Sequence, residues 1–444
     1  MSSIVFFGQA DAGKSTLAGY IVARFDKEFK FSKFIESMKK VNPQYDTRLA
    51  YSSIINTNRD EIEDLQHLNS RAIHLRKVDL PFENVTIIDT PGSENYKKQR
   101  ERGIYYGNVG VFFMEINNIL EHKYTIDTIA PIALWSKLKN KRMIFLLTKF
   151  DMLEYAEDAY YNALGEVENI CRYFGFSGEV TVIPTAIEVD RIKELKNDNL
   201  NTIELGENIC LKSERMPWFN GKTVIDAIKV EIDELDQKDE TEPLMFCITD
   251  QINRPDNRAG KVWNIKILSG ILKVGQEICL APVKDTNNNF RVLTANIKLL
   301  RSDISRFDKK DEVAVARKGE IYGMDIRNCY IDKGHVSKSE YDVISSSCGF
   351  GSSTKFKMSD CFVFEINLMD GESFDIGKEM RLVWLGRSLP FLVKEIDGVI
   401  VLGQLKSTQI AFPIFGNGIS ESILIKGNDS IDFYNCRLLK IGND

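Results

Sequence analysis

The fold of this chain is set first by the octapeptide GQADAGKS at residues 8–15. An apolar run at 4–7 precedes it and predicts a buried strand, and apolar residues at helical spacing follow it from Leu17 to Phe25. Glycines between a strand and a helix let successive backbone N–H groups point at one anion, and the helix N-terminus adds partial positive charge. We therefore predict a phosphate-binding P-loop in which Lys14 reaches the β- and γ-phosphates and Ser15 ligates Mg²⁺.

A second motif, Asp89-Thr90-Pro91-Gly92, follows an apolar run at 85–88 that predicts another buried strand. A carboxylate at the end of a parallel strand beside a P-loop can hold Mg²⁺ through water, which suits Asp89. The N–H of Gly92 can then contact a γ-phosphate. Taken alone, the tetrapeptide is also a common turn, because Asp and Pro start turns and Gly permits positive φ.

Two further motifs also follow predicted buried strands. The strand predicted at 143–147 ends in Thr148-Lys149-Phe150-Asp151. The carboxylate of Asp151 can accept hydrogen bonds from N1–H and the 2-amino group of guanine, a donor pair that adenine does not present. The stem of Lys149 can cover the base or the ribose. After the strand predicted at 180–183, backbone N–H groups at 185–186 can meet O6 of guanine.

The four motifs, in this chain order and each at the end of a strand, resemble those of the P-loop GTPases. Within that group the resemblance is to the translation-factor branch, because residues 89–114 align without a gap with elongation factor 1-alpha and residues 80–89 are similar to its approach to D-x-P-G. The resemblance implies a doubly wound α/β GTPase domain followed by two small β-barrels. It also implies GTP hydrolysis, with GTP/GDP and Mg²⁺ as ligands, coupled to a conformational switch.

The resemblance also implies roles for individual residues. The catalytic residues are Lys14, Gly92 and Ser93, and the Mg²⁺ ligands are Ser15, Ser70 and Asp89. An aspartate that matches Asp11 holds a monovalent cation in related GTPases, so K⁺ is a further implied ligand. The nucleotide-binding residues are Gly8, Asp11, Ala12, Gly13, Lys14, Ser15, Thr16, Thr148, Lys149, Asp151, Thr185 and Ala186.

Two positions depart from the family pattern. An alignment counted back from Asp89 places Ser70 where the family has its switch I threonine. The R-G-I-T signature of the family is absent, and residues 67–70 are HLNS instead. An ordinary surface serine is therefore an equal alternative for Ser70. After D-x-P-G, Ser93 stands where translation-type GTPases have the histidine that positions the attacking water. A serine hydroxyl is shorter, so we expect slow hydrolysis unless a partner completes the site.

The stretch KSERMPWFNG at 212–221 bears on the partner. It resembles the end of the GTPase domain in elongation factor 1-alpha, and more closely the GTPase subunit of bacterial ATP sulfurylase, as does NRP at 253–255. The first hypothesis is therefore a regulatory GTPase that acts on a sulfurylase-like catalytic subunit or another effector protein. The alternative is a specialised elongation-factor-like GTPase acting with tRNA or the ribosome. A third hypothesis keeps GTP as a structural ligand in a scaffold.

The rest of the chain predicts two all-β domains. After a charged segment at 236–242, the apolar period changes from 3.6 to 2 and glycine turns separate short strands. Residues 269–278 also resemble domain II of translation-type GTPases. We expect a GTP-binding domain at 1–236, a β-barrel at 240–333 and a second β-barrel at 335–444. Within the last, serines at 345–347 and the glycine- and serine-rich residues 349–353 predict a flexible loop.

The composition of the chain limits the cellular locations and the classes of partner that we expect. The net charge is −6 and no basic stripe is present, which argues against indiscriminate nucleic-acid binding. The eight cysteines form no C-x-x-C pair, so we interpret them as reduced thiols of a cytoplasmic protein. The chain begins in its first strand and has no apolar run near the roughly 18 residues of a membrane span. We therefore expect neither a signal peptide nor a membrane partner.

Overall fold

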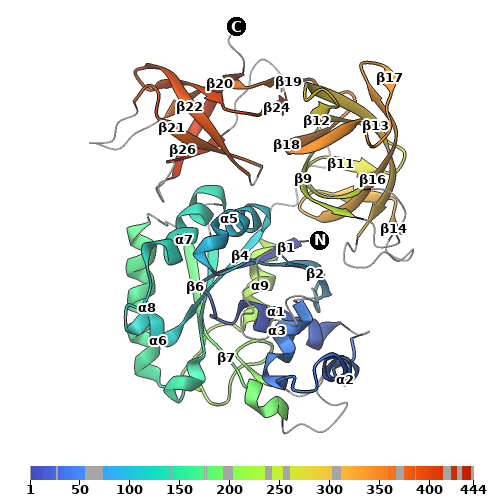
Figure 1. Cartoon of the computed structure of the whole chain (residues 1–444). Helices are drawn as coiled ribbons and strands as arrows, with labels where there is room; N and C mark the ends of the chain where they lie inside the picture. Colours follow the sequence, from blue (N-terminus) through green and yellow to red (C-terminus); the bar gives the residue numbers. More distant parts are fainter. Residues whose placement is uncertain are drawn as a thin grey trace. The chain divides into compact units, whose positions relative to one another are not determined.

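The computed structural model of the chain describes residues 2–26, 29–55, 74–139, 142–174, 176, 178–193, 204–235, 243–253, 261–302, 312–366, 375–385, 387–413, 422–427 and 433–441. The chain divides into two compact units, Met1–Asp236 and Gln237–Asp444 (Figure 1). The first unit is an α/β domain and the second is all-β, so the predicted fold class is confirmed.

The first unit is built on one sheet, with strands in the order β2-β3-β1-β4-β5-β6. Neighbouring strands run parallel except β2, which pairs antiparallel with β3 at one edge. The bounds are β1 Ser2–Gly8, β2 His74–Asp79, β3 Asn84–Asp89, β4 Val109–Glu115, β5 Arg142–Thr148 and β6 Glu179–Pro184. Parallel strands are buried on both faces, which explains why the sequence shows continuous apolar runs here instead of alternation.

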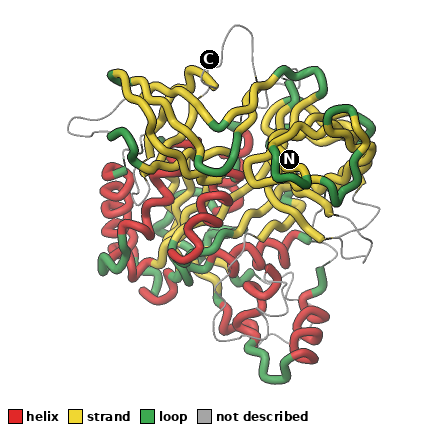
Figure 2. Tube along the Cα trace, turned by 45° about the horizontal axis from the view of Figure 1, so that its top comes forward, coloured by secondary structure: helices red, strands yellow, loops and turns green. Residues whose placement is uncertain are grey.

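Helices cover both faces of this sheet (Figure 2). The helices are α1 Lys14–Phe25, α2 Phe31–Val41, α3 Ala50–Ile55, α5 Lys97–Tyr106, α6 Ile116–Leu120, α7 Ile126–Lys139, α8 Glu157–Tyr173 and α9 Val224–Asp233. Short 3₁₀ turns and a two-residue strand pair complete the unit: η1 Thr47–Leu49, η2 Glu94–Tyr96, η3 Phe150–Leu153, η4 Val189–Lys193, β7 Ala186–Ile187 and β8 Gly206–Glu207.

Aromatic side chains hold the centre of the sheet together. The ring of Phe7 on β1 packs against Phe112 on β4 and Trp135 on α7, with centroids 5.5 and 5.8 Å apart. Phe112 packs in turn against Phe145 on β5, at 4.9 Å. Offset and edge contacts of this kind are favourable beyond the area they bury. This core fixes the strand ends from which the predicted motifs begin.

The path of the P-loop is dictated by Gly8 at the end of β1. Its φ is 130°, and a Cβ at this position would lie 2.3 Å from the carbonyl oxygen of Phe113. Only glycine fits so close to a neighbouring strand with that backbone conformation. The chain therefore curls tightly away from β4 and enters α1, whose first turn closes with a 2.8 Å hydrogen bond from Leu17 N to Gly13 O.

The second unit begins with a sheet in the order β14-β13-β12-β18-β9-β10-β16-β17, which closes into a barrel because β13 also pairs with β16. The small sheet β11-β15 accompanies it. The bounds are β9 Met245–Asn253, β10 Lys261–Ser269, β11 Ile271–Lys273, β12 Glu277–Asp285, β13 Phe290–Arg301, β14 Glu312–Val313, β15 Val315–Arg317, β16 Ile321–Ile331, β17 Gly334–His335 and β18 Tyr341–Gly351. Its core is formed by buried apolar residues of these strands, among them Phe246, Trp263 and Ile297.

A second closed barrel follows, in the order β20-β23-β22-β21-β25-β26, and β19 pairs with β24 beside it. The bounds are β19 Phe356–Ser359, β20 Cys361–Ile366, β21 Glu379–Trp384, β22 Arg387–Asp397, β23 Ile400–Leu405, β24 Ile410–Pro413, β25 Ser422–Gly427 and β26 Phe433–Ile441. Alternating burial along β21 and β23 matches the period-2 pattern of the sequence.

The serine- and glycine-rich segment predicted as a flexible loop is instead largely strand. Residues 345–351 belong to β18, which pairs with β12 and β9, so the first barrel continues to Gly351 and a division at 333–335 falls inside it. Ser347 Oγ donates to Pro282 O at 2.5 Å, and Ser346 Oγ lies 2.7 Å from Thr408 Oγ1. Small hydroxyls that find such partners can be buried in a strand, which composition alone does not reveal.

Several expectations lie outside the described residues. These concern Ser70, the charged segment at 236–242, and Arg254 with Pro255. Within the described part of the chain, no helix combines the length and the apolar character needed to cross a membrane.

Candidate nucleotide-binding site

A cavity of about 420 Å³ lies where β1, β3, β5 and β6 end. The P-loop, the D-x-P-G loop and the segments that follow β5 and β6 all line it, although they are far apart in the sequence. The predicted residues that line the cavity are Asp11, Gly13, Lys14, Ser15, Thr16, Gly92, Ser93, Thr148, Lys149, Asp151, Thr185 and Ala186. Gly8 and Ala12 belong to the same P-loop, and Asp89 reaches the cavity through its contact with Ser15.

Lys14 is buried at one end of the cavity and donates to the P-loop itself. Its Nζ lies 3.4 Å from Gly8 O and also donates to Gln9 O. Burial lowers the pKa of Lys14 to about 8, although the nearby Asp89 carboxylate raises this pKa. A bound anion would favour the charged ammonium, so this end of the cavity suits phosphate.

Beside Lys14, Ser15 Oγ donates a 2.6 Å hydrogen bond to Asp89 Oδ2. Asp89 is buried, and its other oxygen, Oδ1, has no hydrogen-bond partner among the described residues. Burial raises the pKa of Asp89 to about 6. A hydroxyl beside a carboxylate with an unsatisfied buried oxygen is a donor set that fits Mg²⁺ and its waters. The described residues contain no cluster of three acidic, His or Cys side chains that would form a separate metal site.

The D-x-P-G loop lies directly against the P-loop. Thr90 Oγ1 donates to Phe6 O at 2.7 Å, which ties the loop to β1. A Cβ at Gly92 would lie 2.6 Å from Ala10 Cα and 2.7 Å from Lys14 Nζ, so glycine is required by contact with the P-loop. The carbonyl oxygen of Gly92 accepts a 3.0 Å hydrogen bond from Nη1 of Arg100 on α5. The loop is therefore held on both sides.

The other end of the cavity is formed by η3 and the segment after β6. Phe150 N donates to Thr185 O at 3.1 Å, so the Asp151 loop and the Thr185 loop are joined through their backbones. Lys149 has a left-handed φ of 58°, and its Nζ lies 2.6 Å from Glu115 Oε2 at the end of β4. Burial raises the pKa of Asp151 above its ordinary value. The predicted guanine-contacting groups thus share one wall.

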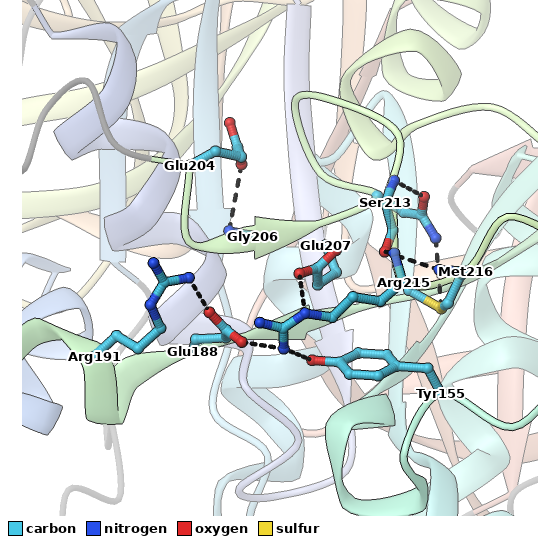
Figure 3. Close-up of polar contacts among 10 residues, drawn as sticks. Tyr155, Glu188, Arg191, Glu204, Gly206, Glu207, Ser213, Arg215 and Met216 are labelled. Carbon is cyan, nitrogen blue, oxygen red and sulfur yellow. Dashed lines mark hydrogen bonds and ion pairs between the residues drawn. The ribbon is translucent and has the colours of Figure 1, made fainter.

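Within the stretch 212–221, the side chain of Arg215 lies among Tyr155, Glu188 and Glu207 (Figure 3). Arg215 Nη1 donates to the hydroxyl of Tyr155 at 2.9 Å and pairs with Glu188, and its Nε lies 3.7 Å from Glu207 Oε1. Trp218 Nε1 donates to Tyr155 O at 3.0 Å. Arg215 therefore joins three segments, after β5, at β7 and at β8, each of which is adjacent to residues that line the cavity.

Some lining residues were not predicted from the sequence. Four of them are apolar neighbours of the base-end motifs: Met152, Ile187, Val189 and Ile209. For Met152, Ile187 and Val189 the signal would have been adjacency to these motifs, whereas Ile209 follows β8 and has no such signal. Leu49 and Ser52 also line the cavity. They come from η1 and α3, in a segment where the sequence shows no motif.

The family model for the elongation factor Tu GTP binding domain matches residues 1–239. Among curated proteins, the chain is similar to elongation factor 1-alpha of Pyrococcus abyssi, at 25% identity over 302 residues, which cover 63% of this chain and 58% of that protein. It is similar to elongation factor 1-alpha of Pyrobaculum islandicum at 22% identity over 347 residues, which cover 72% of this chain and 69% of that protein. The match to the Pyrococcus protein thus spans little more than half of its length.

Among solved structures, the fold is similar to the GTPase-like domain of Saccharomyces cerevisiae Ski7 bound to GTP, with a TM-score of 0.74 and 17% identity, covering 99% of this chain and 97% of that one. It is also similar to the bacterial selenocysteine-specific elongation factor EF-Sec, with a TM-score of 0.63 and 14% identity, covering 99% of this chain and 58% of that one. At these identities the similarity concerns the fold.

Proposed function

Because the chain belongs to the family of the elongation factor Tu GTP-binding domain, we propose that it binds and hydrolyses GTP and changes conformation between its GTP and GDP forms. One observation carries the proposal: the four predicted motifs meet in one cavity, with Lys14 and Ser15 at one end and Asp151 at the other. A cavity of about 420 Å³ falls in the range typical of sites for molecules of this size.

The phosphates would occupy the end formed by the P-loop. Backbone N–H groups at the start of α1 and the Lys14 ammonium would bind their oxygens. Ser15 and, through water, Asp89 would hold Mg²⁺, which supplies positive charge beside the β- and γ-phosphates. Asp11 lines the same end, and K⁺ bound there would add a further charge. The N–H of Gly92 would contact only a γ-phosphate, so its loop would respond to hydrolysis.

The guanine base would occupy the other end. Asp151 would accept from N1–H and the 2-amino group, and the backbone N–H of Ala186 would donate to O6, since the N–H of Thr185 already donates to Leu147 O at 2.8 Å. The left-handed turn at Lys149 connects β5 to η3, and Thr148, Lys149 and Asp151 line the cavity there. We propose slow hydrolysis without a partner, because Ser93 lines the cavity where the translation-type enzymes have a histidine.

For the partner, we propose the alternative from the sequence, an elongation-factor-like GTPase that acts with tRNA or the ribosome. Both curated relatives named above, and EF-Sec among the solved structures, are elongation factors, which favours this class over a sulfurylase-type subunit. The stretch at 212–221 had suggested the sulfurylase subunit. Its contacts with Tyr155 and Glu188 support a role for this stretch beside the proposed base site. We further propose a cytoplasmic location, since the eight cysteines, all in the described part of the chain, are thiols.

Two measurements test this proposal. Equilibrium binding of GTP, GDP and ATP decides whether the cavity takes a guanine nucleotide, and equal affinities for GTP and ATP would contradict it. Cosedimentation with ribosomes, and retention of aminoacyl-tRNA, are then compared with a non-hydrolysable GTP analogue and with GDP. We expect binding with the analogue and loss with GDP. If the protein binds neither ribosomes nor tRNA and captures an unrelated protein instead, the proposed partner is wrong.

A further inference from the structure

The most unusual charged group near the cavity is the guanidinium of Arg100 on α5. Only 1% of this residue is exposed. Its Nη1 donates to Gly92 O at 3.0 Å and its Nη2 donates to Asp127 O at 3.3 Å. Burying a guanidinium costs several kcal/mol unless hydrogen bonds satisfy it. Here those bonds connect the D-x-P-G loop with the beginning of α7.

The contact fixes the part of the loop that faces the phosphates. The carbonyl of Gly92 belongs to the peptide that leads to Ser93, so a donor on this oxygen sets the direction in which Ser93 leaves the loop. On the other side, Gly92 lies so close to the P-loop that a Cβ would be 2.7 Å from Lys14 Nζ. Gly92 is thus held between Arg100 on one side and the P-loop on the other.

The charge of Arg100 acts at the same end of the cavity. Arg100 donates to Gly92 O, and a Cβ at Gly92 would lie 2.7 Å from Lys14 Nζ, so both cations lie next to Gly92. Two cations close enough to affect each other in a buried region create a strong positive potential. GTP carries one more phosphate than GDP at the side where the Gly92 loop closes, so this potential favours GTP.

We propose that Arg100 is a positioning residue that holds Gly92 and Ser93 against the P-loop and thereby sets the preference for GTP over GDP. This inference rests on the proposed guanine-nucleotide function. It assigns to α5 a task that does not require contact with the nucleotide. A purely structural role would instead predict equal losses for both nucleotides.

The chain offers a matched control on the same pair of helices. Lys97, one turn before Arg100 on α5, pairs with the Asp127 side chain at 2.8 Å, and this pair is partly exposed. α5 and α7 lie beside each other (Figure 1). Lys97→Met therefore removes a link between the two helices without removing the hydrogen bond to Gly92.

The experiment compares wild type, Arg100→Met, Arg100→Gln, Arg100→Lys and Lys97→Met. Affinities for GDP and for a non-hydrolysable GTP analogue are measured with Mg²⁺, and thermal unfolding checks that each variant folds. We expect Arg100→Met to weaken the GTP analogue about tenfold and GDP less than about twofold, as loss of a charged hydrogen bond would. Arg100→Gln, which keeps donors but no charge, and Arg100→Lys, which keeps charge, should each restore part of the difference. Lys97→Met should leave the ratio unchanged.

Hydrogen exchange in the nucleotide-free protein separates this inference from the proposed function. If Arg100 holds the loop, amides at 92–96 exchange faster in Arg100→Met and Arg100→Gln than in Lys97→Met. Equal losses of GTP and GDP affinity, or unchanged exchange at 92–96, overturn the inference. If the wild type binds no guanine nucleotide, the proposed function fails and the nucleotide preference fails with it, while the exchange data still decide whether Arg100 holds the loop.

Discussion

Ser15 of the P-loop donates a 2.6 Å hydrogen bond to Asp89 at the end of β3, so the two residues expected to hold Mg²⁺ are already in contact. The bond joins the starts of two loops that come from adjacent parallel strands, β1 and β3. The parallel pairing of these strands thus places the two groups side by side.

Ser15→Ala should weaken Mg²⁺-dependent binding of GTP and GDP together, because it removes a metal ligand and leaves Asp89 without its hydrogen bond. The expected loss is about 10- to 100-fold, which corresponds to about 1.5–3 kcal/mol. Ser15→Thr, which keeps a hydroxyl, is the control and should bind almost as wild type. Titration calorimetry with Mg²⁺ and with EDTA measures the effect. An equal loss in EDTA would show that Ser15 acts on the loop and not on the metal.

Lys14→Ala should abolish nucleotide binding in both conditions.

Asp151→Asn should reverse the base preference. An amide at this position cannot accept from both guanine donors, and each unpaired buried group costs about 1–3 kcal/mol. GTP should therefore bind more weakly, while xanthosine triphosphate, whose 2-oxo group suits an amide donor, should bind better. The control is Asp190→Asn, which changes a largely exposed carboxylate on neighbouring η4. Competition against a fluorescent GDP measures both. An unchanged order of nucleotides would remove Asp151 from the base site.

Arg215→Met should make the end of the cavity formed by η3 and the segment after β6 less rigid, because Arg215 joins Tyr155, Glu188 and Glu207. We expect the ratio of GTP to ATP affinity to fall about three- to tenfold, as for loss of a partly exposed charge network. Arg191→Met is a matched control, since Arg191 also pairs with Glu188 and both arginine side chains are 46% exposed. If both substitutions lower the ratio of GTP to ATP affinity equally, the effect comes from the loss of a partner of Glu188 and not from the links of Arg215 to Tyr155 and Glu207.

Single-turnover hydrolysis by the isolated protein should be slow, below about one per second. Ser93 lies in the cavity, but its side chain is short, so it does not supply the group that orients water in related enzymes. Ser93→His should accelerate hydrolysis, and Ser93→Ala should leave the rate unchanged. A fast wild type would show that another residue already orients the water. A slow Ser93→His protein would show that the Gly92 loop directs this side chain elsewhere.

Glu231 on α9 gives the first unit a pH-dependent stability. Burial raises the pKa of Glu231 to about 7 from 4.5, against the effect of Arg142 nearby. The folded state thus binds the proton more tightly than the unfolded state. The stabilisation is complete below pH 4.5 and disappears as the pH rises to about 7, a loss of about 2 kcal/mol after screening by solvent.

Glu231→Gln should remove the Glu231 contribution to this slope, most clearly between pH 6 and 7, because Asp89, whose pKa burial raises to about 6, adds a slope of the same sign at lower pH. It should also raise the free energy of unfolding of the first unit at pH 8. Glu234→Gln, which changes a more exposed partner of Arg142, should alter it by less than about 0.5 kcal/mol. Chemical denaturation at several pH values between 4.5 and 8 measures both. If the wild type shows no slope in this window, Glu231 is ionised in the folded state.

The convergence of the four motifs on one cavity could be predicted from the sequence because each motif lies in a loop that follows a buried strand. An apolar run fixes each strand, and the residues immediately after it must then meet at one edge of a parallel sheet. Thr148 and Asp151 could therefore be assigned to the same place as Lys14 without any knowledge of the distances between them. The spacing of residues within each motif is enough to predict which of them lie at this edge.

Arg100 could not be found in this way. It belongs to KKQRER at 97–102, which has the composition of a solvated helix face. Only the packing of α5 shows that Arg100 is buried while Lys97 is partly exposed. The prediction of a flexible loop at the serines of β18 was wrong for a related reason. Ser346 and Ser347 are buried, and their hydrogen-bond partners come from distant segments. In both cases a polar residue is buried by tertiary contacts, and local patterns do not encode them.

The packing of Trp218 gives the protein an optical signal of its own. Its indole lies with ring centroids 6.0 Å from Phe150 and 5.3 Å from Tyr160, and Phe150 immediately precedes Asp151. The emission of an indole depends on the dipoles and the water around it, so a base that binds Asp151 changes the surroundings of this ring. The chain has only four tryptophans, and replacing the other three with phenylalanine leaves a single emitter beside the base pocket. Occupancy can then be followed in real time by ultraviolet fluorescence, with natural nucleotides that carry no label.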